Sequence, residues 1–181
     1  CGGAGVKLGI NFHNRHLPWV QDLSRMIREG LIGEVEVVQV EVGSGPRHYE
    51  NWRAEPAMAG LGSVHNVGVH ALDFLRVILG SEPVEVMAMF DESSCESVEM
   101  LGLILLRFDN GALAYCNFNE ALPNPRTDIT IHGSAGRIVG TSLTRSRSDG
   151  DLAILTEDGE TSIHYAAPEA HRLSVAAFTN A

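Results

Sequence analysis

The sequence predicts an α+β domain, in which an open, mainly antiparallel sheet carries helices on one face. Two helical patterns occur before residue 80, and short strand patterns separated by turns fill the stretch from residue 84 to residue 165. Early helices followed by hairpin-linked strands are typical of this class rather than of alternating β–α–β units. A chain of 181 residues is the length of one domain, and such a domain buries roughly 70% of its unfolded surface without needing disulfides or a metal.

The first predicted elements are a short strand-like run, Val6–Asn11, and a helix from about Pro18 to Glu29. Proline suits the first turn of a helix, apolar side chains recur at helical spacing behind it, and Gly30 provides a stop. The next run, Glu34–Gly43, alternates valines with Glu and Gln and is predicted to be a strand. The long stretch 43–62 has neither period, and loops of this length in a domain are usually functional.

A second helix is predicted from about Val64 to Leu79, where an apolar stripe runs until Gly80. Asp109-Asn110-Gly111 is a strong hairpin signal, because Asn-Gly tolerates the positive φ of a type I′ turn. Leu101–Leu106 is apolar on both faces and is expected to be central in the sheet. The predicted strands after the second helix are Val84–Phe90, Leu101–Phe108, Ala112–Phe118, Asp128–His132, Arg137–Gly140, Leu152–Thr156 and Thr161–Tyr165.

Composition argues against several kinds of partner. Lys and Arg number 13 against 23 Asp and Glu, a formal charge of −10, whereas nucleic acids and anionic membranes are bound through clustered basic residues. No apolar run approaches the ~20 residues of a membrane span. The three cysteines, Cys1, Cys95 and Cys116, have no short metal-ligand spacing and suit a reducing compartment. We therefore expect a cytoplasmic protein with no metal site, no nucleic acid and no membrane partner.

The densest group of chemistry-bearing side chains lies on the second helix. Asn66 and His70 are i, i+4 neighbours and Asp73 follows three residues later, so an amide, an imidazole and a carboxylate can share one edge. A helical metal pair needs two histidines at i, i+4, and that pair is absent. A buried histidine bonded to a backbone carbonyl is the alternative interpretation of His70.

Three other stretches could bind a ligand. The glycines in Ala59–Ser63 let the backbone approach a ligand at the positive end of the helix, although a plain flexible turn would also use them. Trp52 and Arg53 suit a polyhydroxylated or carboxylated small molecule, or they form a surface stack. Asn11–His16 lies at a strand exit, where α/β folds bind ligands, or it is a solvated polar turn.

Taken together and in order, these motifs resemble the glucose–fructose oxidoreductase / inositol dehydrogenase / rhizopine catabolism (Gfo/Idh/MocA) family. The resemblance implies a dihydrodipicolinate-reductase-like C-terminal domain with an open sheet, preceded in the family by a Rossmann domain. Residues 1–14 are then the last strand and crossover of that Rossmann domain, and residues 15–181 are a substrate-binding and oligomerisation domain truncated at its C-terminus. The segments that carry the resemblance are Val6–Arg15, Gly30–Val35, Asn51–Arg53, Gly60–Gly62 and His65–Asp73.

The resemblance also implies an activity: NAD(P)-dependent oxidation or reduction at the CH–OH group of a sugar, inositol or related polyol. NAD or NADP is bound mainly by the Rossmann domain, whose glycine fingerprint and Glu-Lys-Pro motif are expected upstream of Cys1, so the fragment alone is expected to be inactive. A homo-oligomer through the open sheet face is implied as well. Because the family includes non-catalytic regulators, a protein that senses sugar or nucleotide on the same fold is the alternative.

At the residue level, the histidine of the family matches His70, which is implied to move a proton to or from the substrate hydroxyl. The aspartate of the family, four positions earlier, falls on Asn66. This is a departure, because an amide cannot hold a negative charge. The remaining implied site residues are Arg15, Trp52 and Arg53 for the substrate, together with Asn66 and His70, and Asn11 for the cofactor.

Overall fold

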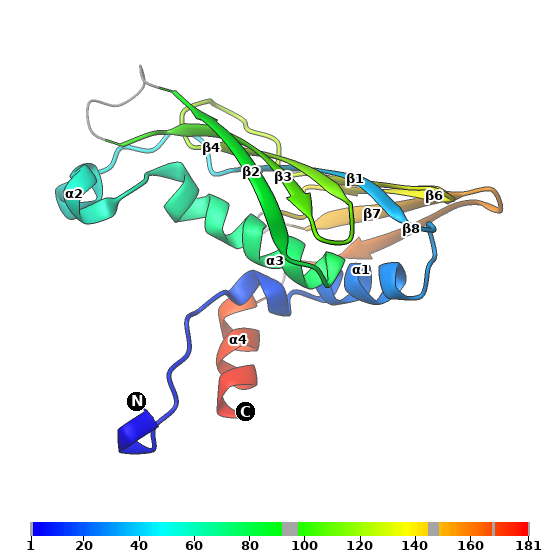
Figure 1. Ribbon diagram of the computed structural model, residues 1–181, viewed down its shortest axis with the longest axis horizontal. Helices are drawn as coiled ribbons and strands as arrows, with labels where there is room; N and C mark the ends of the chain where they lie inside the picture. Colours follow the sequence, from blue (N-terminus) through cyan, green and yellow to red (C-terminus); the bar gives the residue numbers. More distant parts are fainter. Residues whose placement is uncertain (1, 92–97, 145–148, 168, 181) are drawn as a thin grey trace.

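The computed structural model describes the whole chain except residues 1, 92–97, 145–148, 168 and 181, and its main feature is one eight-stranded sheet (Figure 1). The strand order is β2-β3-β4-β1-β5-β6-β7-β8. All neighbouring pairs are antiparallel except β1 and β4, which are parallel. The bounds are β1 Val35–Gly43, β2 Pro83–Phe90, β3 Leu101–Phe108, β4 Leu113–Asn119, β5 Ile129–Gly133, β6 Gly136–Thr141, β7 Gly150–Thr156 and β8 Gly159–Tyr165.

Helices α1 (Pro18–Arg28) and α3 (Val69–Leu79) pack against each other and cover one face of the sheet (Figure 1). The core lies between these layers, because alternate strand side chains such as Val38 and Val40 are buried there. Trp19 of α1 meets Phe74 of α3 edge to face, with ring centroids 5.2 Å apart. The predicted α+β class with helices on one face is confirmed.

The opposite face of the sheet is open within the described chain and is apolar over β2, β3 and β4. Leu105 is 50% exposed and Met87 is 67% exposed, and both lie on this face beside Leu113. β3 is one strand from the edge, so the prediction that it is central was wrong. Its second apolar face is turned away from the helices, toward the side that nothing in the described chain covers.

The β3–β4 hairpin forms as predicted, but its turn is of a different type. Gly111 has a φ of +90°, while Asn110 is not in the left-handed region. The N–H of Phe108 donates to the carbonyl of Ala112 at 2.9 Å, which closes a turn of three residues. The prediction of a type I′ turn was wrong because the loop has three residues, Asp109, Asn110 and Gly111, and not two. In a loop of this length a single left-handed glycine completes the turn.

The long stretch between β1 and α3 contains two short helices, η3 (Asn51–Ala54) and α2 (Pro56–Ala59). The predicted second helix then begins as one π-helical turn, η4 (Val64–Gly68), before it continues as α3. A Cβ at Gly68 would lie 2.9 Å from the Phe118 ring, so the missing side chain lets this turn rest on β4. Single π turns are frequent at functional sites, and this one carries Asn66.

The N-terminal segment contains η1 (Gly2–Ala4) and η2 (His13–His16), and the C-terminal helix α4 (Ala170–Thr179) packs against η2 (Figure 1). The predicted strand Val6–Asn11 pairs with no strand in the described residues. Its alternate apolar side chains Val6, Leu8 and Ile10 are 58%, 77% and 78% exposed. The strand predicted for this run is therefore not formed within the described residues.

Among the helices of the described residues, none is both long and apolar enough to cross a membrane.

Candidate active site

A hollow of about 140 Å³ lies where the loop after β1 meets the π turn before α3. Trp52, Arg53 and Asn66, three of the residues that the sequence assigned to substrate, line the same hollow. A second hollow of about 350 Å³ shares Tyr49, Trp52 and Arg53 with it. The other residues that line the first hollow are Tyr49, Ala59, Leu61, Gly62 and His65.

Trp52 and Arg53 form one surface at the wall of this hollow. The guanidinium carbon of Arg53 lies 5.2 Å from the centroid of the Trp52 ring, so the cation rests on the aromatic face. The surface stack considered for these residues is therefore present, and the stacked pair also lines the hollow. An aromatic face beside a guanidinium donor fork can hold the ring and the hydroxyls of a small polyol.

A buried carboxylate, Glu120, lies behind the hollow. The parallel register of β1 and β4 pairs Gly43 with Asn119, so the next residues of the two strands, Ser44 and Glu120, are brought together. The Glu120 side chain is 0% exposed, and Nε of Arg47 lies 2.9 Å from its Oε1. The Ser44 hydroxyl donates to the same oxygen at 2.6 Å.

The same carboxylate also binds two of the polar side chains that line the hollow. Nδ2 of Asn66 donates to Oε1 at 2.8 Å and to Oε2 at 3.0 Å, and the Tyr49 hydroxyl donates to Oε2. Burial raises the pKa of the Tyr49 phenol, and the hydrogen bond to Glu120 raises it further, so the phenol stays protonated and remains a donor.

Sequence reasoning missed Glu120. The only signal was an acidic residue directly after an apolar strand, which is as typical of a solvated strand end as of a buried site. Nothing in the sequence connects position 120 to position 66, because the contact depends on how the π turn packs on β4.

His70 lies on α3, one turn after Asn66, and is half-buried against aromatic rings of the N-terminal segment. Its ring centroid is 4.6 Å from that of His13 and 6.4 Å from that of Phe12, and His13 stacks on His171 of α4 at 4.3 Å. Nδ1 of His70 is buried and has no hydrogen-bond partner in the described residues. The backbone-carbonyl interpretation therefore does not hold for this nitrogen.

Burial lowers the pKa of His70 below the ordinary imidazole value of 6.5. Asp73 acts in the opposite direction and His171 adds to the lowering. The ring is consequently neutral at physiological pH, which is the form that can accept a proton. His70 is not among the residues that line the two hollows described above.

Arg15 and Asp73 form a two-point ion pair between η2 and α3. Nε of Arg15 donates to Oδ2 of Asp73 at 2.9 Å, and Nη2 donates to Oδ1. The hydrogen bond to Asp73 raises the pKa of the Arg15 guanidinium. The sequence placed Asp73 on one edge of the helix with Asn66 and His70, and in the structure its carboxylate binds Arg15. Arg15 does not line either hollow.

The backbone donors at the start of the π turn are used within the protein. Oε2 of Glu99 accepts from the N–H of Gly62 at 2.6 Å, and Oε1 accepts from the N–H of Val64 at 3.0 Å. Of the two interpretations considered for this stretch, a ligand-binding backbone and a plain turn, the first therefore finds no free donor at Gly62 or Val64, because a carboxylate from the segment before β3 already satisfies both N–H groups.

Asn11 contacts the C-terminal helix: its Oδ1 accepts a hydrogen bond from the Ser174 hydroxyl at 2.6 Å. This contact fixes the exposed N-terminal segment against α4, close to the His13–His171 stack.

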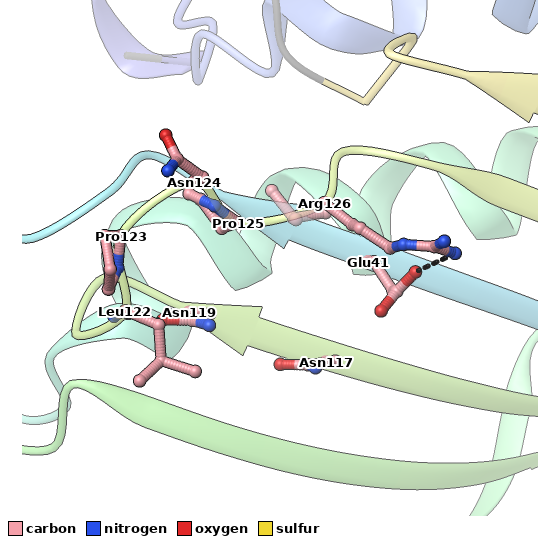
Figure 2. Close-up of a pocket in the computed structure, with 9 residues that line it drawn as sticks. Glu41, Asn117, Asn119, Leu122, Pro123, Asn124, Pro125 and Arg126 are labelled. Atoms are coloured by element: carbon pink, nitrogen blue, oxygen red, sulfur yellow. Dashed lines mark hydrogen bonds and ion pairs between the residues drawn. The ribbon is translucent and has the colours of Figure 1, made fainter.

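A third hollow, of about 210 Å³, lies beside the β4–β5 loop (Figure 2). Arg126 reaches across it to Glu41, with Nη1 and Oε2 3.8 Å apart. None of the residues that the sequence assigned to the site line it. For the part of the chain that the structure covers, no three His, Cys, Asp or Glu side chains are placed to hold a metal ion.

The fold is that of the C-terminal domain of a class of oxidoreductases, as comparison with known proteins shows. The chain belongs to the Gfo/Idh/MocA family, whose C-terminal domain matches residues 20–139.

Relatives that resemble this chain act on sugars and inositols, by their names. This chain is 28% identical over 183 residues to 1,5-anhydro-D-fructose reductase of Ensifer adhaerens, and the match covers 98% of this chain and 54% of that protein. It is 24% identical to inositol 2-dehydrogenase of Rhizobium meliloti, covering 97% and 51% respectively. The chain therefore spans about half the length of these relatives.

Solved structures agree on the fold. Aldose-aldose oxidoreductase from Caulobacter crescentus, complexed with glycerol, superimposes with a TM-score of 0.82 at 23% identity, covering 99% of this chain and 56% of that one. A 3-ketoreductase from Actinomadura kijaniata, in complex with NADP and TDP-benzene, gives a TM-score of 0.80 at 21% identity, covering 99% and 55%.

Proposed function

We propose that this chain is the substrate-binding half of an NAD(P)-dependent oxidoreductase that acts on the CH–OH group of a sugar, inositol or related polyol. The observation that carries the proposal is the hollow in which the Trp52–Arg53 stack faces Asn66, one helical turn before a neutral His70. The names of the relatives support the substrate class, and the NADP complexes among the structural neighbours support the cofactor class.

The residues present fit the nicotinamide end of such a cofactor rather than its phosphates. The buried, unpartnered Nδ1 of His70 and the fixed side chain of Asn11 are polar groups at the junction of η2, α3 and α4 that could border the nicotinamide. The sequence has no glycine fingerprint for the phosphates, which we assign to a preceding domain. When bound, the cofactor supplies hydride chemistry.

The side chains of this domain bind the substrate and move its proton. The Trp52 ring and the Arg53 guanidinium bind the ring and the hydroxyls of the polyol. Neutral His70 accepts the hydroxyl proton during oxidation, and the protonated ring returns it during reduction. Arg15 holds η2 to α3 through Asp73, which fixes the segment that packs on His70.

The experiment compares this chain with the full-length protein that contains it. We expect the full-length protein to reduce 1,5-anhydro-D-fructose with NADH or NADPH, or to oxidise an inositol with NAD⁺ or NADP⁺, whereas residues 1–181 alone show no turnover. The assay is absorbance of the reduced nicotinamide at 340 nm, a wavelength set by the cofactor. Binding of these sugars without turnover in the full-length protein would support the sensing regulator instead.

We further propose that the protein forms a homo-oligomer through the open face of the sheet. The exposed apolar side chains Met87, Leu105 and Leu113 adjoin a hollow of about 460 Å³ on that face, and a second copy of the same face would cover them. The negative charge and the cysteines support a cytoplasmic location without nucleic-acid or membrane partners.

A charge on the open face tests the oligomer. Leu105→Lys is expected to convert the full-length protein to a monomer in light scattering, because each copy would have to bury a lysine in the apolar interface. Val175→Lys, on the exposed side of α4, is the matched control and is expected to leave the oligomer intact. A wild-type protein that is monomeric at high concentration would rule out this interface.

A further inference from the structure

We propose that Glu120 is a positioning residue that fixes the side-chain amide of Asn66, so that Oδ1 of Asn66 is presented as an acceptor for a substrate hydroxyl. The substrate part of this inference rests on the proposed function. The arrangement of Glu120 behind Asn66 is a property of the fold and can be tested separately.

The Asn66 amide turns its NH₂ end toward the Glu120 carboxylate. Both carboxylate oxygens of Glu120 accept a hydrogen bond from Nδ2 of Asn66, at 2.8 and 3.0 Å. A carboxylate paired with Arg47 can only accept hydrogen bonds, so the NH₂ end of the amide must face it. Rotation of the amide by 180° would place two acceptors against each other in a buried site, which is strongly unfavourable.

The Glu120 carboxylate is held in place by its backbone and by its side-chain partners. Glu120 donates its N–H to the carbonyl of Met100 at 2.8 Å and accepts from the N–H of Arg47 at 2.9 Å, so its backbone is held on both sides. Its side chain is fully buried, accepts hydrogen bonds from Ser44 and Tyr49 as well as from Asn66, and pairs with Arg47. The carboxylate has no favourable alternative position, because moving away from these donors would leave a buried negative charge without hydrogen bonds.

The amide of Asn66 can then offer a ligand its oxygen atom. With Nδ2 held by Glu120, the group of Asn66 left for a ligand is the acceptor Oδ1. Asn66 lines the hollow beside the Trp52–Arg53 stack, where Arg53 supplies donors. The site therefore combines a donor fork with a fixed acceptor, and this pair recognises a hydroxyl, which can both donate and accept.

The test exchanges charge and amide between the two positions in the full-length protein. E120Q frees the amide to rotate and is expected to raise KM for the sugar about tenfold while kcat changes less than about threefold, since ground-state binding is lost. N66D places two carboxylates in contact. The double variant N66D/E120Q restores one amide and one carboxylate, and KM is expected to return to within about threefold of wild type. E82Q, at an exposed ion pair, is the matched control for the same chemical change.

A second readout needs no turnover. N66D is expected to lower the urea midpoint, and adding E120Q is expected to recover about half of that loss or more. Equal midpoints for N66D and the double variant would overturn the role of Glu120. Parallel losses of kcat and stability in E120Q with unchanged KM would reduce Glu120 to a structural residue and also overturn it. If the wild type turns over neither sugar, the proposed function fails, while the midpoint comparison still decides whether Glu120 holds the amide.

Discussion

Replacing His70 with alanine is expected to lower kcat of the full-length protein for polyol oxidation by at least about 100-fold. The neutral ring is the group proposed to accept the hydroxyl proton, and the half-buried site leaves little water to take over that role. Steady-state kinetics at pH 7.5 measure the effect. Turnover equal to wild type in the alanine variant would rule out the proton-transfer role of His70.

The pH profile separates a lost proton acceptor from a damaged site. Burial lowers the pKa of His70, so kcat/KM for oxidation is expected to be flat at neutral pH and to fall only below the ordinary value of 6.5. The ring must be neutral to accept a proton, so activity is lost as the pH drops through its lowered pKa. His70→Gln keeps the size and polarity of the side chain and is expected to lack this acidic limb. An unchanged acidic limb in His70→Gln would assign it to another group.

Replacing Arg15 with methionine is expected to lower the free energy of unfolding by about 3 kcal/mol or more. The side chain of Arg15 is 39% exposed, whereas that of Asp73 is 3% exposed, so the variant leaves a buried carboxylate without its partner. Methionine keeps the apolar stem of arginine, and therefore the loss reports on the ion pair. Urea unfolding followed by fluorescence measures it.

Removing the other partner should cost less. Asp73→Ala leaves Arg15, which water can reach, and is expected to lower stability by only about 1–2 kcal/mol. This order, with the arginine variant less stable than the aspartate variant, is the signature of a pair that is buried at one end. If Arg15→Met instead raised KM and left stability unchanged, the substrate role that the family resemblance implied for Arg15 would be supported.

The sequence predicted the fold class and the strands well because those features depend on local periodicity. The alternating valines of Glu34–Gly43 became β1, and the apolar stripe after Val64 became a helix. The π turn was missed because it depends on Gly68 resting against Phe118, 50 positions away. Side-chain period alone does not report such a contact.

The candidate site was predicted only in part, for the same reason. Trp52, Arg53 and Asn66 were identified by their chemistry, and the structure brings them to one hollow. Glu120 and Glu99 were missed, since both reach the π turn from the distant β3–β4 hairpin region. From the sequence, Asn66 was therefore interpreted as the loss of the negative charge that the family carries at this position. In the structure a carboxylate, that of Glu120, lies directly against the Asn66 amide.

The position of β1 between β4 and β5, neither of which is its neighbour in sequence, is expected to set the order in which the domain assembles. Two groups of strands lie on either side of β1 in the sheet: β2 to β4, and β5 to β8. Within each group the strands follow one another in sequence and pair antiparallel, so each group can form from local contacts. Inserting β1 between the two groups closes the longest loops of the sheet, so we expect it to be the slow, entropy-limited event of folding. Ser44 reaches Glu120 only through the pairing of β1 with β4, and ligand-binding competence should therefore appear last during refolding, together with the final step.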